Sequence, residues 1–252
     1  MSVAENLRPP SWLLLALEGR AGLEFASLVP TLPLLERAPR GDGHPVLVLP
    51  GYLASDRSTQ ALRWYLRRRG HHVHGWRLGR NFGPAPEVVD GLGERFAALV
   101  ARHGRKVSLV GWSLGGIYAR EIARRAPEHV RQVITLASPF RGTAASNVGR
   151  FARRDRFPPS PELRERLASP LPVPSTALYS RTDGIVSWQS CVQDEAPRSE
   201  NVEVWSSHCG MGHHPAALWV IADRLAQAED TWSPFRWPAW ARPWVPAMRA
   251  VG

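Results

Sequence analysis

Short apolar runs alternate with longer helical stretches along most of the chain, and this alternation constrains the fold more than any other feature. Parallel strands joined by helices form right-handed crossovers, which leave helices on both faces of the sheet. The candidate strands are residues 46–49, 72–78, 107–110, 133–137, 176–180 and 202–206. The pattern therefore predicts an α/β fold with a mostly parallel, six-stranded sheet.

The helical stretches fit this sheet into a single domain of 252 residues, whose core we expect at residues 44–230. A hydrophobic content of 44% is enough to fill one large core and excludes a disordered chain. The candidate helices are residues 56–69, 87–103, 114–126, 187–195 and 215–228.

Three segments lie outside the alternation. Residues 1–40 predict one or two amphipathic helices, broken at Pro30 and Pro33. Residues 142–174 are rich in Arg and Pro and hold one short candidate helix at about 162–167. A long segment of this kind inside a compact domain is commonly a lid or binding loop, and a mobile surface insertion is the alternative. The tail at 231–252 carries four tryptophans among prolines. Two interpretations of this tail stay open: it docks on the body of the protein, or it contacts a lipid interface.

The chain is basic, but its charge does not identify a partner. It has 32 Lys and Arg against 22 Asp and Glu, a formal net charge of +10, and Lys106 is its single lysine. The arginines are scattered from Arg8 to Arg249 and form no single stripe, so no nucleic-acid partner is predicted.

Two cysteines, Cys191 and Cys209, are too few for a disulfide framework or a Cys-rich zinc module. Neither a metal site nor a cofactor is predicted, because no carboxylate cluster accompanies them. The apolar run at residues 12–17 is too short for a membrane span, and no export signal is evident. These features favour the cytoplasm.

The motif Gly-Trp-Ser-Leu-Gly-Gly at residues 111–116 joins a predicted strand to a predicted helix. In this context it is a Gly-x-Ser-x-Gly nucleophile elbow, in which Ser113 occupies a tight, strained turn and the glycines relieve crowding. A glycine-rich turn that only joins two elements is the alternative.

A serine hydroxyl needs a neighbouring base and an acid that orients the base, and in this arrangement both follow the serine in the chain. Asp183 ends the strand before the last one, where Gly184 allows the chain to turn away. His208 comes directly after the last strand and is the predicted base, with His213 as the reserve candidate. Ser113, Asp183 and His208 are therefore the predicted catalytic triad.

Acyl transfer also needs two backbone N–H groups that stabilise the oxyanion. Leu114, directly after the nucleophile, supplies the first candidate. The loop after the first strand supplies the second, with Tyr52 as the first choice and Leu53 as the next. The alternative is that this loop only leads the chain out of the strand and holds no oxyanion donor.

The candidate substrate-binding residues are apolar and lie in or beside loops at the C-terminal ends of strands, where open α/β sheets bind ligands. They are Leu53, Trp112, Phe140 and Ile185. A core position is the alternative for each of them. Together they favour an apolar acyl group over a phosphate or a sugar.

These motifs resemble those of the α/β-hydrolase superfamily and, within it, of small bacterial lipases and esterases. The resemblance covers about residues 46–228. It rests on the elbow, on Pro-Gly-Tyr at 50–52, on Ser-Arg-Thr-Asp-Gly-Ile-Val at 180–186 and on Ser-His-Cys-Gly-Met at 207–211.

The resemblance implies Ser113 as nucleophile, Asp183 as acid and His208 as base, with the amides of two residues as the oxyanion hole. Those residues are Tyr52 and Leu114. One departure concerns the oxyanion loop, because Pro50 stands where the family often has a histidine that supports it.

The resulting prediction is a metal-independent serine carboxylic ester hydrolase that acts through an acyl-enzyme on lipid or small-molecule esters. An acyltransferase or thioesterase with the same triad is the second hypothesis, since the fold does not select the acceptor. A non-catalytic, Arg-rich binding protein is the third.

Cys191 and Cys209 flank the predicted acid and base, which raises the hypothesis of a disulfide between the two loops. A pair of free thiols is the alternative. A bridge would favour the periplasm or secretion over the cytoplasm.

Overall fold

The structure is a computed structural model that describes residues 7–142, 146–147 and 160–246. Its centre is a six-stranded sheet of order β2-β1-β3-β4-β5-β6, in which each neighbouring pair is parallel. The strands are β1 (Pro45–Leu49), β2 (His72–Gly75), β3 (Val107–Trp112), β4 (Val130–Leu136), β5 (Ser175–Tyr179) and β6 (Ser199–Glu203). The predicted parallel sheet is confirmed.

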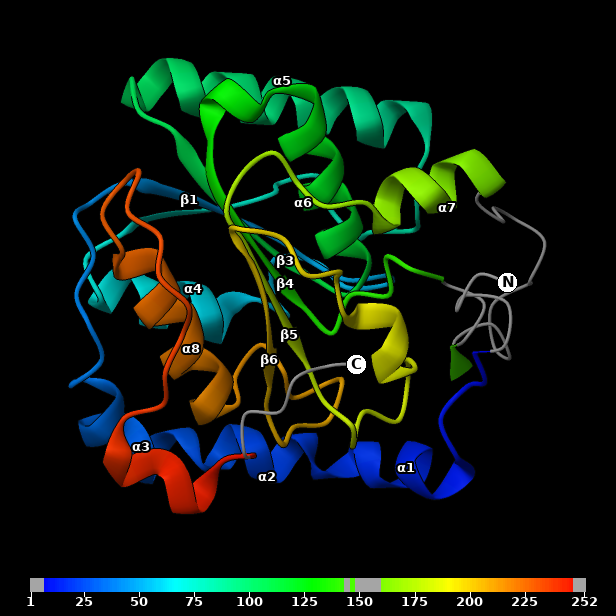
Figure 1. The fold of residues 1–252 in the computed structure, drawn as a ribbon, viewed down its shortest axis with the longest axis vertical. Coiled ribbons are helices and arrows are strands. Elements are labelled where there is room, and N and C mark those ends of the chain that lie inside the picture. The colour runs from blue at the N-terminus through cyan, green and yellow to red at the C-terminus, as the bar shows by residue number, and fades with distance from the viewer. Residues whose placement is uncertain (1–6, 143–145, 148–159, 247–252) are drawn as a thin grey trace.

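Helices cover both faces of this sheet (Figure 1). The α-helices are α1 (Trp12–Ala16), α2 (Ala21–Ala26), α3 (Leu28–Leu35), α4 (Gln60–Arg68), α5 (Pro86–His103), α6 (Leu114–Arg125), α7 (Pro161–Ala168) and α8 (Pro215–Ala226). Short 3-10 helices are η2 (Leu17–Arg20), η3 (Pro127–His129), η5 (Trp188–Cys191) and η6 (Ala239–Trp244). In the part of the chain that the structure describes, no helix is both long and apolar enough to cross a bilayer.

The two faces of the sheet follow from the alternation of side chains along each strand. Leu47 and Leu49 of β1 pack with α5 and α6, whereas Val46 and Val48 of the same strand pack with α4 and α8. The central strands are buried on both faces, as their continuous apolar sequences predict.

The bounds of the strands differ from the prediction by up to three residues, and at β2 a side-chain hydrogen bond redirects the chain. β2 ends at Gly75 instead of residue 78, since the N–H groups of Trp76 and Arg77 both donate to the Asp56 carboxylate at 3.1 Å. β6 begins at Ser199 and ends at Glu203, so it lies three residues earlier than predicted.

The helix predicted at 187–195 is wrong beyond the single 3-10 turn of η5. The chain becomes extended at Val192, and Gln193 then holds it against the sheet. The Gln193 amide donates to the carbonyls of Ser175 and Glu200 at 3.0 and 2.9 Å. The break predicted at Pro30 and Pro33 is also wrong, because α3 contains both residues.

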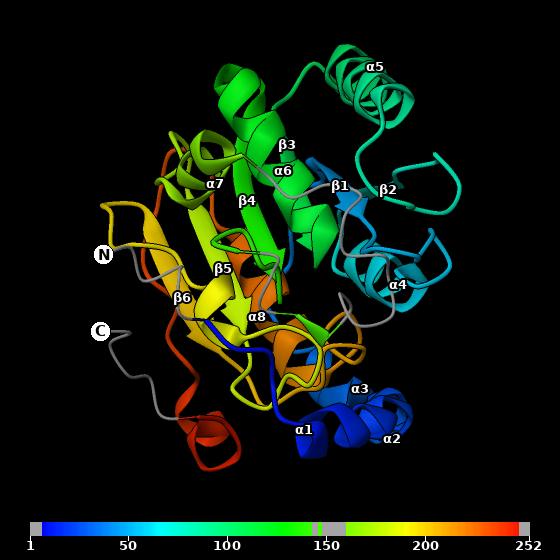
Figure 2. The same cartoon turned by 90° about the vertical axis from the view of Figure 1, so that its right-hand side faces the viewer.

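Residues 7–38 form a chain of short helices along the carboxyl ends of the strands, at the bottom of Figures 1 and 2. The tail packs on the body, where Phe235 and Trp237 are buried in the same core cluster as α8. Residues 143–145 and 148–159 of the predicted insertion, and 247–252 of the tail, lie outside the described residues.

One buried arginine joins α6 to its surroundings. Arg120 is fully buried and donates to the carbonyls of Leu167 and Ser169 at 3.0 and 2.7 Å, and to Gln193 Oε1 at 3.1 Å. Its guanidinium also lies 4.0 Å from the ring centre of Phe140. Burial, with the nearby charges of other arginines, lowers the pKa of Arg120 to about 9.

We expect Arg120→Met to lower the free energy of unfolding by about 2–3 kcal/mol, because it removes these hydrogen bonds from buried acceptors. Arg125→Met, on the exposed side of the same helix, should change it by less than about 0.5 kcal/mol. Urea denaturation of both variants measures the difference. Equal stabilities would show that Arg120 does not tie α6 to the neighbouring elements.

Candidate active site

Ser113 lies at the turn between β3 and α6, in a strained backbone conformation. Its φ is +52° and its ψ is −120°, a region that non-glycine residues rarely adopt. Its N–H donates to the Leu136 carbonyl at 2.8 Å, and its own carbonyl accepts from Ser138 Oγ at 2.6 Å. These bonds hold the turn to the end of β4.

The glycines of the motif allow the close contacts that this turn needs. A Cβ on Gly111 would lie 2.3 Å from the Gly115 carbonyl oxygen. A Cβ on Gly115 would lie 2.3 Å from the Leu49 carbonyl oxygen of β1. Side chains at these positions would push α6 away from the sheet, so the predicted elbow geometry is present.

Asp183 and His208 meet in a direct hydrogen bond between the loops that follow β5 and β6. His208 Nδ1 lies 2.7 Å from Asp183 Oδ2. The other carboxylate oxygen, Oδ1, accepts the N–H groups of Ile185 and Val186, both at 2.8 Å. The carboxylate is 98% buried, and its orientation is therefore fixed on both sides.

The electrostatics around His208 favour its protonated form. Burial lowers the pKa of the imidazole, but the negative charge of Asp183, their hydrogen bond and the charge of Glu18 together raise it above the ordinary value of 6.5. With Nδ1 directed at Asp183, the Nε2 atom is the one left to exchange a proton with a nucleophile.

The neighbours of Ser113 connect it to the histidine loop and to the loop after β1. Trp112, the preceding residue, donates its indole N–H to the His208 carbonyl at 3.1 Å. On the other side, a Cβ placed on Gly51 would lie 3.2 Å from the Cβ of Ser113. The structure thus gathers the predicted nucleophile, acid, base and oxyanion loop at the carboxyl end of the sheet.

A residue that sequence reasoning missed supports the oxyanion loop. Asn81 is fully buried, and its side-chain amide donates to the Pro50 carbonyl at 2.9 Å. Its backbone carbonyl accepts the Leu53 N–H at 2.6 Å, which occupies the second-choice oxyanion donor and leaves Tyr52 as the candidate. Asn81 thus ties the loop after β1 at Pro50 and at Leu53, and no local motif marks it.

The four predicted substrate-binding residues have different surroundings. Leu53 is 51% exposed beside the oxyanion loop, and Ile185 is partly buried next to Asp183. Trp112 is buried, with its indole bound to the histidine loop. Phe140 is 99% buried in a core cluster beneath Arg120, so its surroundings are those of a core residue.

Cys191 and Cys209 are free thiols, so the structure contradicts the hypothesis of a disulfide between them. Cys191 is buried in its own loop, where its thiol lies 3.7 Å from the Ser187 carbonyl oxygen. The reserve base, His213, points to the N-terminal helices instead of Asp183: its Nε2 lies 3.1 Å from the Ala21 carbonyl oxygen.

A second residue that sequence reasoning missed is Glu18, in η2. One carboxylate oxygen accepts the N–H groups of Gly184 and His208 at 2.8 and 2.9 Å, and the other accepts that of Cys209 at 2.9 Å. A single carboxylate therefore binds both loops that carry Asp183 and His208, the predicted acid–base pair. No motif marks it in the sequence, because it lies 165 residues before Asp183.

The neighbouring charges of the same segment act on the same loops. Glu24 accepts the Ser207 N–H at 2.8 Å and its hydroxyl at 2.6 Å. Arg20 pairs with Glu24 and donates to the carbonyl and hydroxyl oxygens of Thr182 at 2.7 and 2.9 Å. The N-terminal helices are thus a structural part of the candidate site.

No family model matches the chain. A triacylglycerol lipase of Burkholderia plantarii is 29% identical over 147 residues, which are 54% of this chain and 40% of that protein. A triacylglycerol lipase of Pseudarthrobacter phenanthrenivorans is 28% identical over 109 residues, which are 40% of this chain and 34% of that protein. The matches span less than half the length of these relatives.

Solved structures resemble about three quarters of the chain. Lipase B of Aspergillus fumigatus aligns with a TM-score of 0.57 at 16% identity, covering 74% of this chain and 53% of that one. An α/β superfamily hydrolase from Oenococcus oeni aligns with a TM-score of 0.56 at 16% identity, covering 73% of this chain and 92% of that one. The chain has the α/β-hydrolase fold.

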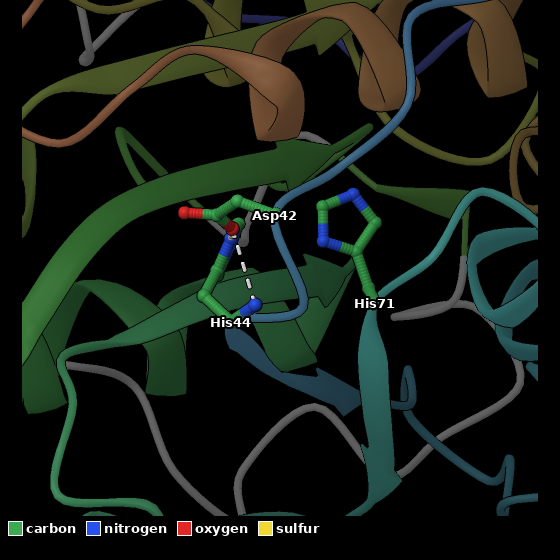
Figure 3. A group of neighbouring side chains, drawn as sticks. All are labelled: Asp42, His44 and His71. Carbon is green, nitrogen blue, oxygen red and sulfur yellow. Dashed lines mark hydrogen bonds and ion pairs between the residues drawn. The ribbon is translucent and has the colours of Figure 1, made fainter.

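Away from the candidate site, this α/β-hydrolase fold holds one group of metal-ligating residue types among the described residues (Figure 3). Ligand atoms of Asp42, His44 and His71 lie within 4.8 Å of one another. His71 is buried, and both its ring nitrogens lack a hydrogen-bond partner among the described residues. Burial lowers its pKa to about 3, which keeps the imidazole neutral.

The hydrogen bonds and ion pairs that His44 and Asp42 already make do not favour a cation at this group. His44 uses both ring nitrogens, with Asp42 Oδ1 at 2.6 Å and Ser108 Oγ at 2.8 Å. The other carboxylate oxygen of Asp42 pairs with Arg105 and Arg131 at 2.7 and 2.9 Å. Two guanidinium groups already neutralise this carboxylate, so we interpret the group as a link between the start of β1 and strands β3 and β4.

We expect NMR titration of the wild-type chain to place the pKa of His208 above 6.5, and Glu18→Gln to lower it. The glutamine keeps the size of the side chain but removes a negative charge that favours imidazolium. Glu36→Gln is the matched control, because Glu36 lies in the same N-terminal region and pairs with Arg68. An unchanged His208 pKa in Glu18→Gln would show that Glu18 is electrostatically uncoupled from the pair.

Proposed function

We propose that the protein is a serine-dependent carboxylic ester hydrolase of the esterase or lipase type. The observation that carries this proposal is the buried Asp183–His208 pair, 2.7 Å from nitrogen to oxygen, at the same sheet edge as the strained Ser113. The triacylglycerol lipases that the chain resembles, and the hydrolases that share its fold, support a hydrolytic reaction.

In the proposed reaction, His208 Nε2 takes the proton of the Ser113 hydroxyl as its oxygen attacks the ester carbonyl. The tetrahedral intermediate collapses when His208 returns the proton to the leaving alcohol, which leaves an acyl group on Ser113. Water then enters, and its oxygen attacks the acyl carbonyl as His208 takes one of its protons. The second tetrahedral intermediate collapses when His208 returns the proton to the Ser113 oxygen, which breaks the bond to the acyl group and releases the acid. Asp183 remains ionised and keeps Nδ1–H of the imidazole in place.

The N–H groups of Leu114 and Tyr52 are the proposed oxyanion donors. Leu114 begins α6, so its N–H lies in the first turn of a helix, where backbone donors are directed out of the helix end. The N–H of Tyr52 is on the loop that Asn81 supports against Pro50. One such donor typically contributes about 3 kcal/mol to transition-state stabilisation.

An apolar groove supports esters of lipophilic acids as the substrate class. It has a volume of about 620 Å³ and runs along α6 from Leu114, the residue beside the nucleophile, to Ala126. Its walls are the apolar side chains of α5, such as Leu92 and Phe96, and of α7, such as Leu163. A long acyl chain would bury its methylene groups there with little polar contact.

We expect the wild-type chain to hydrolyse p-nitrophenyl esters, with kcat/KM rising from the C2 to the C8 acyl group. Ser113→Ala should lower kcat by at least about a thousandfold, because the nucleophile is lost. Ser138→Ala, at a serine that donates to the Ser113 carbonyl, is the control for a general effect on the turn. Unchanged turnover in Ser113→Ala would overturn the proposal.

The pH dependence of kcat/KM follows from the environment of His208. Its raised pKa means that the imidazole becomes a base only at a pH above the ordinary value of 6.5. Activity should therefore be lost as the pH falls through a midpoint above 6.5, and the midpoint should move to lower pH in Glu18→Gln. A midpoint near 4, typical of a carboxylate, would contradict His208 as the base.

A further inference from the structure

The N-terminal helices expose apolar side chains and turn their charges inward, the reverse of an ordinary surface segment. Between residues 11 and 33, no exposed residue is charged. Leu13, Leu23 and Val29 are 70%, 76% and 79% exposed, and Phe25 is 56% exposed. We call the exposed residues of 11–33 the N-terminal apolar face.

The three charged residues of this stretch explain its orientation. Glu18, Arg20 and Glu24 are partly buried and bind the loops that carry Asp183 and His208. The packing is close, because a Cβ on Gly184 would lie 2.2 Å from the Leu14 carbonyl oxygen. With its polar side directed at the active-site loops, the segment presents its apolar side to the surroundings.

The position of this face suits an enzyme surface that meets its substrate. α1 and α2 lie at the carboxyl ends of the strands, next to the loops of the acid–base pair (Figures 1 and 2). Large apolar side chains that are exposed together on one segment usually mark a binding surface. Leu53 and Phe82, beside the oxyanion loop, are also 51% and 66% exposed.

Charge decides between the possible occupants of the face. In the sequence, exposed arginines flank it on both sides, with Arg8 before it and Arg37 and Arg40 after it, while the exposed Glu36 pairs with Arg68. The chain carries a net charge of +10, so two copies brought together on this face would repel each other. A negatively charged lipid surface would attract the arginines and accept the apolar side chains.

We propose that the N-terminal apolar face docks on the surface of anionic lipid. Leu13, Leu23, Phe25 and Val29 enter the boundary between headgroups and acyl chains, and the flanking arginines pair with lipid phosphates. The docked segment is the one that binds both loops of the acid–base pair, so the candidate site lies beside the lipid. This docking does not depend on the proposed hydrolysis and holds for a catalytically inactive chain as well.

The test is flotation of the full chain with vesicles of phosphatidylcholine alone or with 30% phosphatidylglycerol, chosen as the anionic probe. We expect binding to the anionic vesicles, weakened by high salt, and at least about tenfold weaker binding by Leu23→Gln/Val29→Gln. The control, Trp64→Gln, changes an apolar residue of α4 that is 44% exposed and lies outside the N-terminal apolar face. Its binding should equal that of the wild-type chain.

Equal vesicle binding by Leu23→Gln/Val29→Gln and by Trp64→Gln, or no binding by the wild-type chain, would overturn the proposal. Analytical ultracentrifugation without lipid tests the other occupant, a second copy of the chain. A dimer that dissociates in Leu23→Gln/Val29→Gln but not in the control would assign the face to self-association and also overturn the proposal. Circular dichroism confirms that both variants are folded, which these exposed positions lead us to expect.

Discussion

The left-handed backbone of Ser113 is the constraint on which the rest of the candidate site depends. A non-glycine residue in such a conformation costs about 1–3 kcal/mol, so neighbouring contacts have to hold it. Here the ends of β1 and β4, and the absence of side chains at Gly111 and Gly115, permit and hold the turn. Because the strands are parallel, their carboxyl ends deliver the other functional loops to the same edge.

The acid–base pair depends in turn on the N-terminal segment. Glu18 accepts three N–H groups from the two loops that carry Asp183 and His208, which fixes the loops relative to each other. That contact also determines which side of the helices faces outward, since the charged residues are used inside. The same hydrogen bonds thus connect the electrostatics of His208 to the exposed apolar face.

Local patterns predicted the sheet and the positions of Ser113, Asp183 and His208 at the ends of its strands, because apolar runs and the elbow motif are short-range signals. Glu18 and Asn81 were missed because their roles come from contacts across the fold, and neither lies in a motif. The amphipathic pattern of residues 1–40 predicted one or two helices, and the structure has four short ones between Trp12 and Leu35, but the pattern did not show which side they bury. Their charged side is turned inward because the loops offer unpaired N–H groups, which outweigh the usual preference for apolar burial.

Active-site labelling tests the central claim most directly. We predict that diethyl p-nitrophenyl phosphate adds one diethylphosphoryl group to the wild-type chain, that peptide mass spectrometry locates it on Ser113, and that His208→Ala slows the addition at least about a thousandfold. The reagent requires an activated serine but no particular substrate. Labelling of a different serine, or equal rates in the wild-type chain and His208→Ala, would contradict the account.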